Sequence, residues 1–211
     1  MELLCFNCLE STQTYLLQEL KAKRVSAPIC VMAKEQTAGI GSRDNRWEGG
    51  EGNLFFSFAV ELAHLPHDLP LSSASIYFSF IMKELLQKYD TEVWLKWPND
   101  LYQDSYKIGG TITKKTDTIL LCGMGINLQK NLNGFKALNL NVEPIFLLKE
   151  YLLSLEKYPS WKQVFSLYRI EFERSREYFT HIDGELKSLE NAILSEDGSL
   201  LIEKKRVYSI R

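Results

Sequence analysis

Apolar positions along the chain follow two different spacings. Short apolar runs, several of them alternating with polar residues, predict β-strands over residues 3–8, 29–33, 53–62, 93–97, 108–114 and 118–122. Helical spacing predicts a helix that starts near Ser11 or Thr12, a second over 71–89, and two more over 144–157 and 161–178. The stretch between residues 128 and 143 is polar and is expected to be irregular. We therefore expect one principal domain that combines strands and helices.

The pattern changes near residue 179. Asp183-Gly184 and Asp197-Gly198 are hairpin signals that separate short alternating runs at 192–194, 200–203 and 207–210. About 30 residues are too few to bury a stable core of their own. We expect a principal domain over 1–178 and a small β domain over 179–211 that packs against it.

Composition and charge narrow the class of protein. The chain has 211 residues, of which 45% are hydrophobic, and Lys plus Arg number 25 against 27 Asp plus Glu. A net charge of -2 gives no support for non-specific nucleic-acid binding, which needs a basic face. No apolar run reaches transmembrane length and the N-terminus has no leader pattern. A soluble, cytoplasmic protein that binds neither nucleic acid nor membrane is expected.

Four cysteines are too few and too scattered for a disulfide framework. Cys5 and Cys8 have the spacing of a redox or zinc pair. A redox pair would need a following helix in a thioredoxin-like unit, and a zinc site would need a second pair, which the sequence lacks. Small apolar residues of an N-terminal strand are the favoured interpretation.

Residues 96–127 carry the clearest sign of a functional site. Pro98 cannot donate to a central strand ladder, so Asn99 and Asp100 are expected in a polar loop at a strand end, where binding groups are common. Lys107 opens the next strand, and Asn127 closes the one after it. Four glycines in these two strands (Gly109, Gly110, Gly123 and Gly125) leave room for a ligand to approach the backbone.

A second candidate lies in residues 38–52. Gly39 and Gly41 can free backbone N–H groups to form an anion nest, Arg43 and Arg46 can pair with phosphate or carboxylate oxygens, and Trp47 can cover an aromatic base. A solvated surface loop explains the same composition equally well. The hydroxyls at the start of the first helix have two interpretations as well, because a helix cap and a ligand contact use the same geometry.

Several motifs, taken in order, resemble those of the biotin protein ligase family. They are Gln36-Thr37-Ala38-Gly39, Lys96-Trp97-Pro98-Asn99-Asp100-Leu101, Lys107-Ile108-Gly109-Gly110 and Gly123-Met124-Gly125-Ile126-Asn127. The resemblance implies an α+β fold, with a mixed β-sheet backed by helices as in class II synthetases and an SH3-like β domain at the C-terminus. It also implies a reaction: ATP and Mg²⁺ convert biotin to biotinoyl-AMP, and biotin then passes to a lysine of the biotin carboxyl carrier protein of acetyl-CoA carboxylase.

The resemblance also implies roles for individual residues. Lys107, Arg43 and Asp100 would be catalytic. The residues expected to bind biotin are Ser11, Thr12, Gln13, Gln36, Ile40, Gly41, Ser42, Lys107, Gly109 and Gly110. Those expected to bind ATP are Gly39, Arg43, Arg46, Trp47, Asn99, Lys107 and Asn127, and no protein-bound metal is expected. Ile40 and Ser42 stand where the family usually has arginine, so Arg43 is expected to supply the missing cation.

Few residues precede Ser11, so a short form without a DNA-binding domain is expected, and an exposed sheet edge would allow a homodimer. Two alternatives remain. A lipoate protein ligase would run the same adenylation on another acid, but the R-R-x-S-G-G-G block of those enzymes is missing. A non-catalytic module that binds biotin or a nucleotide is the other, and the changed residues at 40 and 42 leave it open.

Overall fold

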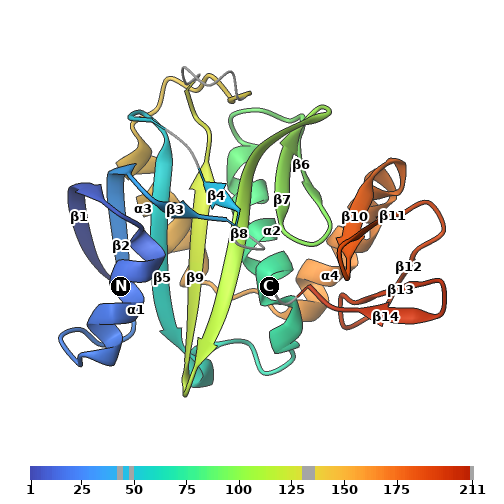
Figure 1. Cartoon of the computed structure of the whole chain (residues 1–211), viewed down its shortest axis with the longest axis horizontal. Coiled ribbons are helices and arrows are strands. Elements are labelled where there is room, and N and C mark those ends of the chain that lie inside the picture. The colour runs from blue at the N-terminus through green and yellow to red at the C-terminus, as the bar shows by residue number, and fades with distance from the viewer. Residues whose placement is uncertain (42–44, 48–49, 130–135, 210–211) are drawn as a thin grey trace.

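A seven-stranded mixed sheet forms the centre of the protein in a computed structural model that describes residues 1–41, 45–47, 50–129 and 136–209. Its strand order is β1-β2-β5-β9-β8-β7-β6 (Figure 1). The strands are β1 (Glu2–Leu9), β2 (Ile29–Gln36), β5 (Leu54–Glu61), β6 (Val93–Lys96), β7 (Asp100–Gln103), β8 (Tyr106–Thr116) and β9 (Ile119–Ile126). Only β1 and β2 pair in parallel; the remaining neighbours in this sheet are antiparallel. The predicted mixed sheet is confirmed.

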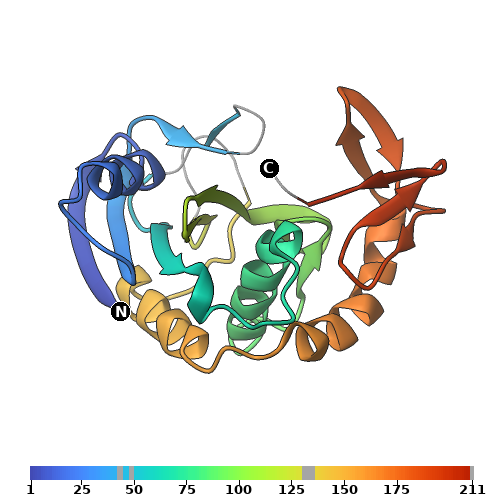
Figure 2. The ribbon, with the colours of Figure 1, turned by 90° about the horizontal axis from the view of Figure 1, so that it is seen from below.

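Helices cover both faces of this sheet, but unequally. Helix α1 (Thr12–Lys21) lies on one face, and α2 (Ala74–Leu86), α3 (Pro144–Leu155) and α4 (Trp161–Glu171) follow the other (Figure 2). Successive side chains of β2 point to opposite faces of the sheet, and this explains why there are two cores. Ile29 and Val31 pack beneath α1, whereas Cys30 and Met32 belong to the larger core under the three other helices.

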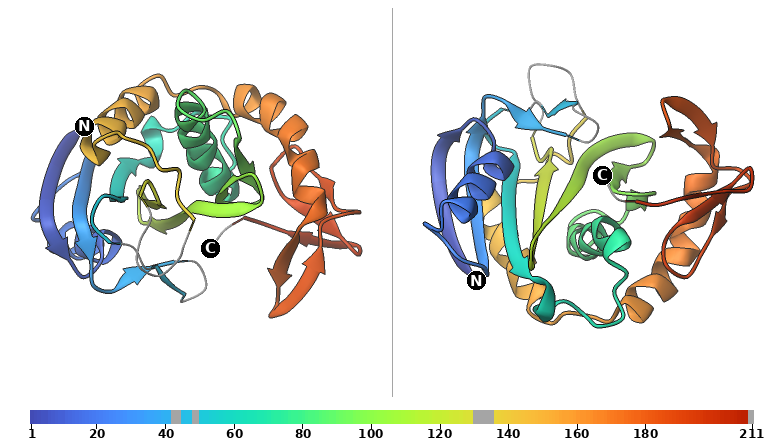
Figure 3. Two further views of the ribbon diagram at one scale, coloured as in Figure 1. Left: turned by 90° about the horizontal axis from the view of Figure 1, so that it is seen from above. Right: turned by 60° about the horizontal axis from the view of Figure 1, so that its bottom comes forward.

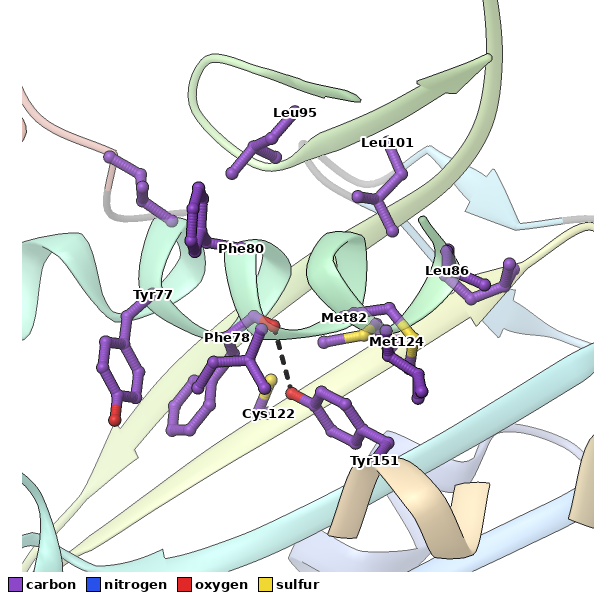
Figure 4. Close-up of a cluster of buried hydrophobic side chains, with 14 of the residues drawn as sticks. Tyr77, Phe78, Phe80, Met82, Leu86, Leu95, Leu101, Cys122, Met124 and Tyr151 are labelled. Carbon is purple, nitrogen blue, oxygen red and sulfur yellow. Dashed lines mark hydrogen bonds between the residues drawn. The ribbon is translucent and has the colours of Figure 1, made fainter. Parts of the chain in front are cut away.

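The larger core is rich in aromatic side chains. Phe56, Phe58 and Phe78 are buried. Phe56 and Phe58 stack with ring centroids 6.2 Å apart, and the contacts of these rings with Phe78 or Tyr151 are edge-on at 5.0–6.1 Å. The Tyr151 hydroxyl is buried as well and donates to the carbonyl oxygen of Phe78 at 3.2 Å, which ties α3 to α2 (Figure 4). This core packs the face of the sheet that α2, α3 and α4 cover. The face that carries α1 is less covered and has room for a site.

Helix starts agree with the sequence. The Ser11 hydroxyl caps α1 by accepting from the N–H of Thr14, and Ser160 forms a capping box with Gln163 at the start of α4. The fourth helix is shorter than expected. It ends at Glu171 and continues as a 3-10 segment, η4 (Phe172–Glu177), so the prediction of a helix to residue 178 was wrong at its end.

Two further small sheets complete the C-terminal part. They contain β10 (Phe179–Ile182) with β11 (Glu185–Ser188), and β12 (Ile193–Leu194) with β13 (Leu200–Ile202) and β14 (Lys205–Val207). These strands lie beside the β6 end of the main sheet, next to α4 (Figure 3). A small β unit at this end agrees with the expected fold, and the boundary at residue 179 stays a prediction. None of the helices in the described ranges has both the length and the apolar character needed to cross a bilayer.

Candidate active site

A cavity of about 260 Å³ lies on the α1 face of the sheet, over β8 and β9. Several positions where these strands meet the cavity are glycine. Gly123 lies opposite Ser57 of β5, and Gly125 lies opposite Gly110 of β8. A methyl group on Gly123 would lie 2.6 Å from Gln13 Oε1, and one on Gly125 would lie 2.5 Å from the ring of Trp47. Glycine at these positions lets neighbouring side chains close over the backbone.

The lining brings together most of the residues expected from the sequence. Its described members are Ser11, Thr12, Gln13, Gln36, Ile40, Gly41, Asn45, Arg46, Trp47, Ser57, Asn99, Asp100, Lys107, Gly110, Thr111, Ile112, Gly123, Met124, Gly125 and Asn127. Ser42 and Arg43, which were expected to bind biotin and ATP, lie outside the described residues.

Two predicted residues lie elsewhere. Gly109 is on the opposite face of β8 from the cavity, because side chains alternate along a strand; a methyl group there would meet Ile126 and Leu101 in the core. Gly39 belongs to a short hairpin of β3 (Gly39–Ile40) and β4 (Arg46–Trp47), where a methyl group would lie 2.5 Å from the carbonyl oxygen of Trp47. Both glycines allow close backbone packing and are not part of the lining.

The floor of the cavity is a neutral hydrogen-bonding network. Gln36 Oε1 accepts from the backbone N–H of Thr12 at 2.8 Å and from its hydroxyl at 3.1 Å. The Thr12 hydroxyl also shares a hydrogen bond of 2.9 Å with Ser57 Oγ. The network joins the start of α1 to β2 and β5, so the cap of a helix also contributes polar groups to the cavity.

Three buried polar atoms of the lining have no hydrogen-bond partner in the described structure. They are Gln13 Oε1, Asn127 Oδ1 and Trp47 Nε1. Asn127 uses its other amide atom, Nδ2, to donate to the carbonyl oxygen of Lys136 at 3.3 Å. An unpaired buried polar group is costly. A bound molecule with complementary donors and acceptors would remove this cost.

Charged side chains lie at the mouth of the cavity. Lys107 Nζ lies 2.7 Å from Asp100 Oδ1, and Lys96 Nζ lies 3.8 Å from the other oxygen of the same carboxylate. The Lys107 side chain is 41% exposed, whereas that of Lys96 is 9% exposed. Arg46 is exposed and donates to the carbonyl oxygen of Thr37. The mouth can therefore receive an anionic group, and Asp100 can accept a proton or orient an amine.

The turn that carries Asn99 and Asp100 is tighter than the predicted loop. Strand β6 ends at Lys96, and the chain turns and re-enters the sheet at Asp100, so the two strands form a hairpin. Asn99 Nδ2 donates to the carbonyl oxygen of Thr111, and the N–H of Thr111 donates back to the Asn99 carbonyl oxygen at 3.0 Å. Asn99 thus locks the turn onto β8, in addition to lining the cavity.

Sequence reasoning missed several lining residues: Asn45, Ser57, Thr111, Ile112 and Met124. Ser57 had a detectable signal, because it is a polar residue within the apolar run 54–60 and is fully buried. Thr111 is also buried and accepts a hydrogen bond from Ser79 of α2 at 2.7 Å, a contact between segments 32 residues apart that no local pattern reveals.

The chain matches the family model described as "Biotin/lipoate A/B protein ligase family" over residues 5–131. A crystal structure of the Biotin Acetyl Coenzyme A Carboxylase Synthetase from Helicobacter pylori, with bound biotinylated ATP, is 40% identical. The two superpose with a TM-score of 0.93, over 98% of this chain and 99% of the other. A biotin protein ligase from Aquifex aeolicus in complex with biotin and ATP has a similar fold, with a TM-score of 0.70 over 100% of this chain and 96% of that one at 20% identity.

Curated relatives match over a shorter length. The bifunctional ligase/repressor BirA of Escherichia coli is 32% identical over 127 residues, which are 57% of this chain and 38% of BirA. The biotin–protein ligase 2 of Arabidopsis thaliana is 31% identical over 109 residues, 47% of this chain and 32% of that protein. This chain therefore aligns with about a third of the length of these relatives. Together with the family model and the structural match, they show that the chain belongs to the biotin/lipoate A/B protein ligase family, among its biotin protein ligases.

Proposed function

We propose that this chain uses ATP to convert biotin to biotinoyl-AMP and then transfers biotin to a lysine of the biotin carboxyl carrier protein of acetyl-CoA carboxylase. The observation that carries the proposal is the division of the cavity into a neutral buried floor and a cationic mouth at Lys107. Biotin has the same division, with a neutral ureido ring at one end and a carboxylate at the other. The 40% identical biotin acetyl coenzyme A carboxylase synthetase of Helicobacter pylori supports this choice.

The unpaired acceptor on Gln13 favours biotin over lipoate. A buried carbonyl oxygen needs an N–H or O–H donor. The ureido group of biotin offers N–H donors, whereas the dithiolane ring of lipoate has none. A site built to form such hydrogen bonds discriminates strongly against an analogue that lacks them, because its own polar groups stay unpaired. Gln13 Oε1 and the Ser57 hydroxyl next to it provide this selection on the cavity floor.

In the first step the carboxylate of biotin attacks the α-phosphate of ATP and pyrophosphate leaves. Both reactants are anionic, so positive charge must hold them together and stabilise the transition state. Lys107 is placed at the mouth to do this, and Arg46 lies beside the same opening. Trp47 lies over Gly125 with its indole N–H unpaired and would contact the nucleotide. Arg43 would add a further cation, although it lies outside the described residues.

In the second step the amine of the carrier lysine attacks the acyl carbon and AMP leaves. The amine must be neutral to attack, so it has to lose a proton first. Asp100 is the carboxylate of the described lining, and it would orient the amine or accept that proton. Asn99 would position Asp100 through its hydrogen bonds to Thr111.

Magnesium would enter with ATP rather than occupy a preformed protein site. The described residues contain no group of three or more His, Cys, Asp or Glu side chains that could hold a metal ion. Asp100 is engaged by two ammonium groups, at 2.7 and 3.8 Å. Mg²⁺ commonly binds to substrate phosphates with one or two carboxylates. Its chemistry would be to neutralise phosphate charge, and the residues described above would hold the acid and the amine.

Incubation with ATP, biotin and a purified carrier domain tests this proposal. We expect a biotinylated carrier on an avidin blot, pyrophosphate release with biotin but not with lipoate, and no product without ATP. Lipoate-dependent pyrophosphate release would instead support a lipoate ligase. Tight biotin binding by calorimetry without any pyrophosphate release would support a non-catalytic binding module.

A further inference from the structure

The turn between β12 and β13 is inserted beneath the hairpin that carries Asn99 and Asp100. Trp97 is fully buried, and its indole Nε1 donates to the carbonyl oxygen of Gly198 in that turn at 2.9 Å. The backbone N–H of Trp97 donates to the hydroxyl of Ser175 in η4 at 3.2 Å. One residue of the family motif is therefore hydrogen-bonded to two segments that lie 78 and 101 residues further along the chain.

The inserted turn fits closely against α2. Gly198 has a φ of +76°, and a methyl group on it would lie 2.4 Å from Ser73 Oγ at the start of that helix. The Ser73 hydroxyl in turn donates to the carbonyl oxygen of Asp197. A side chain at position 198 would be strained by this φ and would displace either the turn or the side chains of Ser73 and Ile76.

Trp97 is also at the first position of the turn between β6 and β7. The preceding residue, Lys96, pairs with Asp100 across the hairpin. Asn99, two residues after Trp97, is hydrogen-bonded to Thr111. The turn has only three residues, so a shift of the indole moves the backbone of Asn99 and Asp100 with it. Misplacement of a reacting group by about 1 Å can lower a rate by about a hundredfold.

We propose that Trp97 is a positioning residue for the ligase reaction: it transmits the packing of the C-terminal strands to Asn99 and Asp100. This inference rests on the proposed function. Trp97 does not line the described cavity, so its effect on catalysis passes through the turn. The C-terminal strands would accordingly help to hold Asn99 and Asp100 in position.

The chain provides a matched control. Trp161 of α4 is also buried, and its Nε1 donates to the carbonyl oxygen of Glu196, two residues before Gly198, at 2.8 Å. Both indoles therefore hold the same C-terminal turn through one hydrogen bond each. Only Trp97 lies in the same three-residue turn as Asn99. Replacing either Trp by Phe removes one indole N–H and keeps an aromatic ring.

The experiment compares W97F and W161F in the full chain. Both should lower the urea midpoint of unfolding by similar amounts. We expect kcat for biotinoyl-AMP formation to fall about tenfold or more in W97F, with KM for biotin nearly unchanged, and by less than about twofold in W161F. Ser175→Ala, which removes the acceptor of the Trp97 N–H, is a milder second variant and should lower kcat in the same direction.

Native-state hydrogen exchange provides a readout that does not depend on activity. The N–H of Thr111, which donates to Asn99, should exchange faster in W97F than in W161F. Equal exchange at Thr111 in the two variants, or equal loss of kcat, would overturn the positioning role. A wild-type chain that forms no biotinoyl-AMP would overturn the proposed function instead, and the exchange comparison would still decide whether Trp97 holds the turn.

Discussion

Replacing Lys107 by methionine separates the contribution of its charge to catalysis from its contribution to stability. The ammonium lies 2.7 Å from Asp100 Oδ1, but the side chain is 41% exposed. Ion pairs at such exposure contribute about 0–1 kcal/mol to the free energy of unfolding, because water and salt screen them. Asp100 keeps Lys96 at 3.8 Å in the variant. We therefore expect a change in unfolding free energy at the low end of that range.

The effect on the reaction should be much larger. Removing one group that stabilises charge in a transition state typically costs about 2.7–4 kcal/mol, or about a hundredfold to a thousandfold in rate. Lys115→Met is a matched control, since Lys115 is exposed on the same strand, beyond the described lining, and its loss removes the same charge. We expect K107M to lower the rate of adenylate formation at least a hundredfold and K115M to leave it unchanged.

Single-turnover pyrophosphate release, with saturating ATP and biotin, measures this rate directly. Urea denaturation of both variants measures the free energy of unfolding in parallel. A near-normal rate in K107M would refute the role of Lys107 as the cation at the biotin carboxylate. A loss of rate accompanied by a loss of several kcal/mol in stability would refute the reasoning from exposure.

Three other predictions follow from the cavity and from the helix caps. Gln13→Leu removes an acceptor that has no partner in the free protein, so the free energy of unfolding should not change. Calorimetry should show biotin binding weakened by up to about tenfold (about 0.5–1.5 kcal/mol). Equal affinity would contradict the role of Gln13 as an acceptor for biotin. Gly125→Ala should displace the ring of Trp47, quench or shift its fluorescence and weaken biotin binding, whereas Gly50→Ala, with no atom within 4 Å, should do neither. The Asp68 carboxylate accepts from the first two N–H groups of α4, so Asp68→Asn should lower the free energy of unfolding by about 0.3–1 kcal/mol at neutral pH, the usual contribution of a negative charge at an exposed helix N-terminus.

The loss of stability caused by Asp68→Asn should depend on pH. Burial opposes ionisation of Asp68, but the backbone N–H groups of Lys162 and Trp161 at the start of α4 donate to its carboxylate and hold its pKa below the ordinary value of 3.8. A depressed pKa in the folded state contributes stability that is complete above the unfolded pKa and is lost as pH falls through the folded one. The stability difference between wild type and D68N, measured by urea denaturation, should therefore shrink below pH 3.8; a constant difference would show that the charge has no part in the cap.

Local patterns predicted the long elements well. The apolar run 53–62 is strongly strand-like, and its observed limits are Leu54–Glu61. The hairpin of β6 and β7 was missed because Pro98 does end a strand, as expected, but nothing in the local sequence shows that the chain turns back within three residues. That turn is held by Thr111, 12 residues from its partner Asn99, and by Gly198, 101 residues from its partner Trp97.

The candidate site was predictable where its chemistry repeats a family motif and unpredictable where it depends on which face a residue occupies. Gly109 and Gly110 are neighbours with the same composition signal, yet only Gly110 lines the cavity, because strand alternation directs Gly109 into the core. The register of β8 decides this, and register is a property of the whole sheet. Ser57 is the converse case: its polar character in an apolar strand was visible, but its contact with Thr12 requires the folded chain.

The distribution of charge in the cavity also determines which way round a ligand must bind. An ionised carboxylate buried on the neutral floor would lose its hydration without gaining a counter-charge, which is far more costly than leaving a neutral ring unpaired there. The floor offers Thr12, Ser57 and the unpaired Gln13 oxygen, and the charged groups Lys107 and Asp100 lie at the mouth. Under the proposed reaction, the acid group of biotin is therefore held at the open end, where ATP and then a lysine of the carrier can reach it. The neutral ring fills the closed end and, through Gln13, determines which acid is accepted.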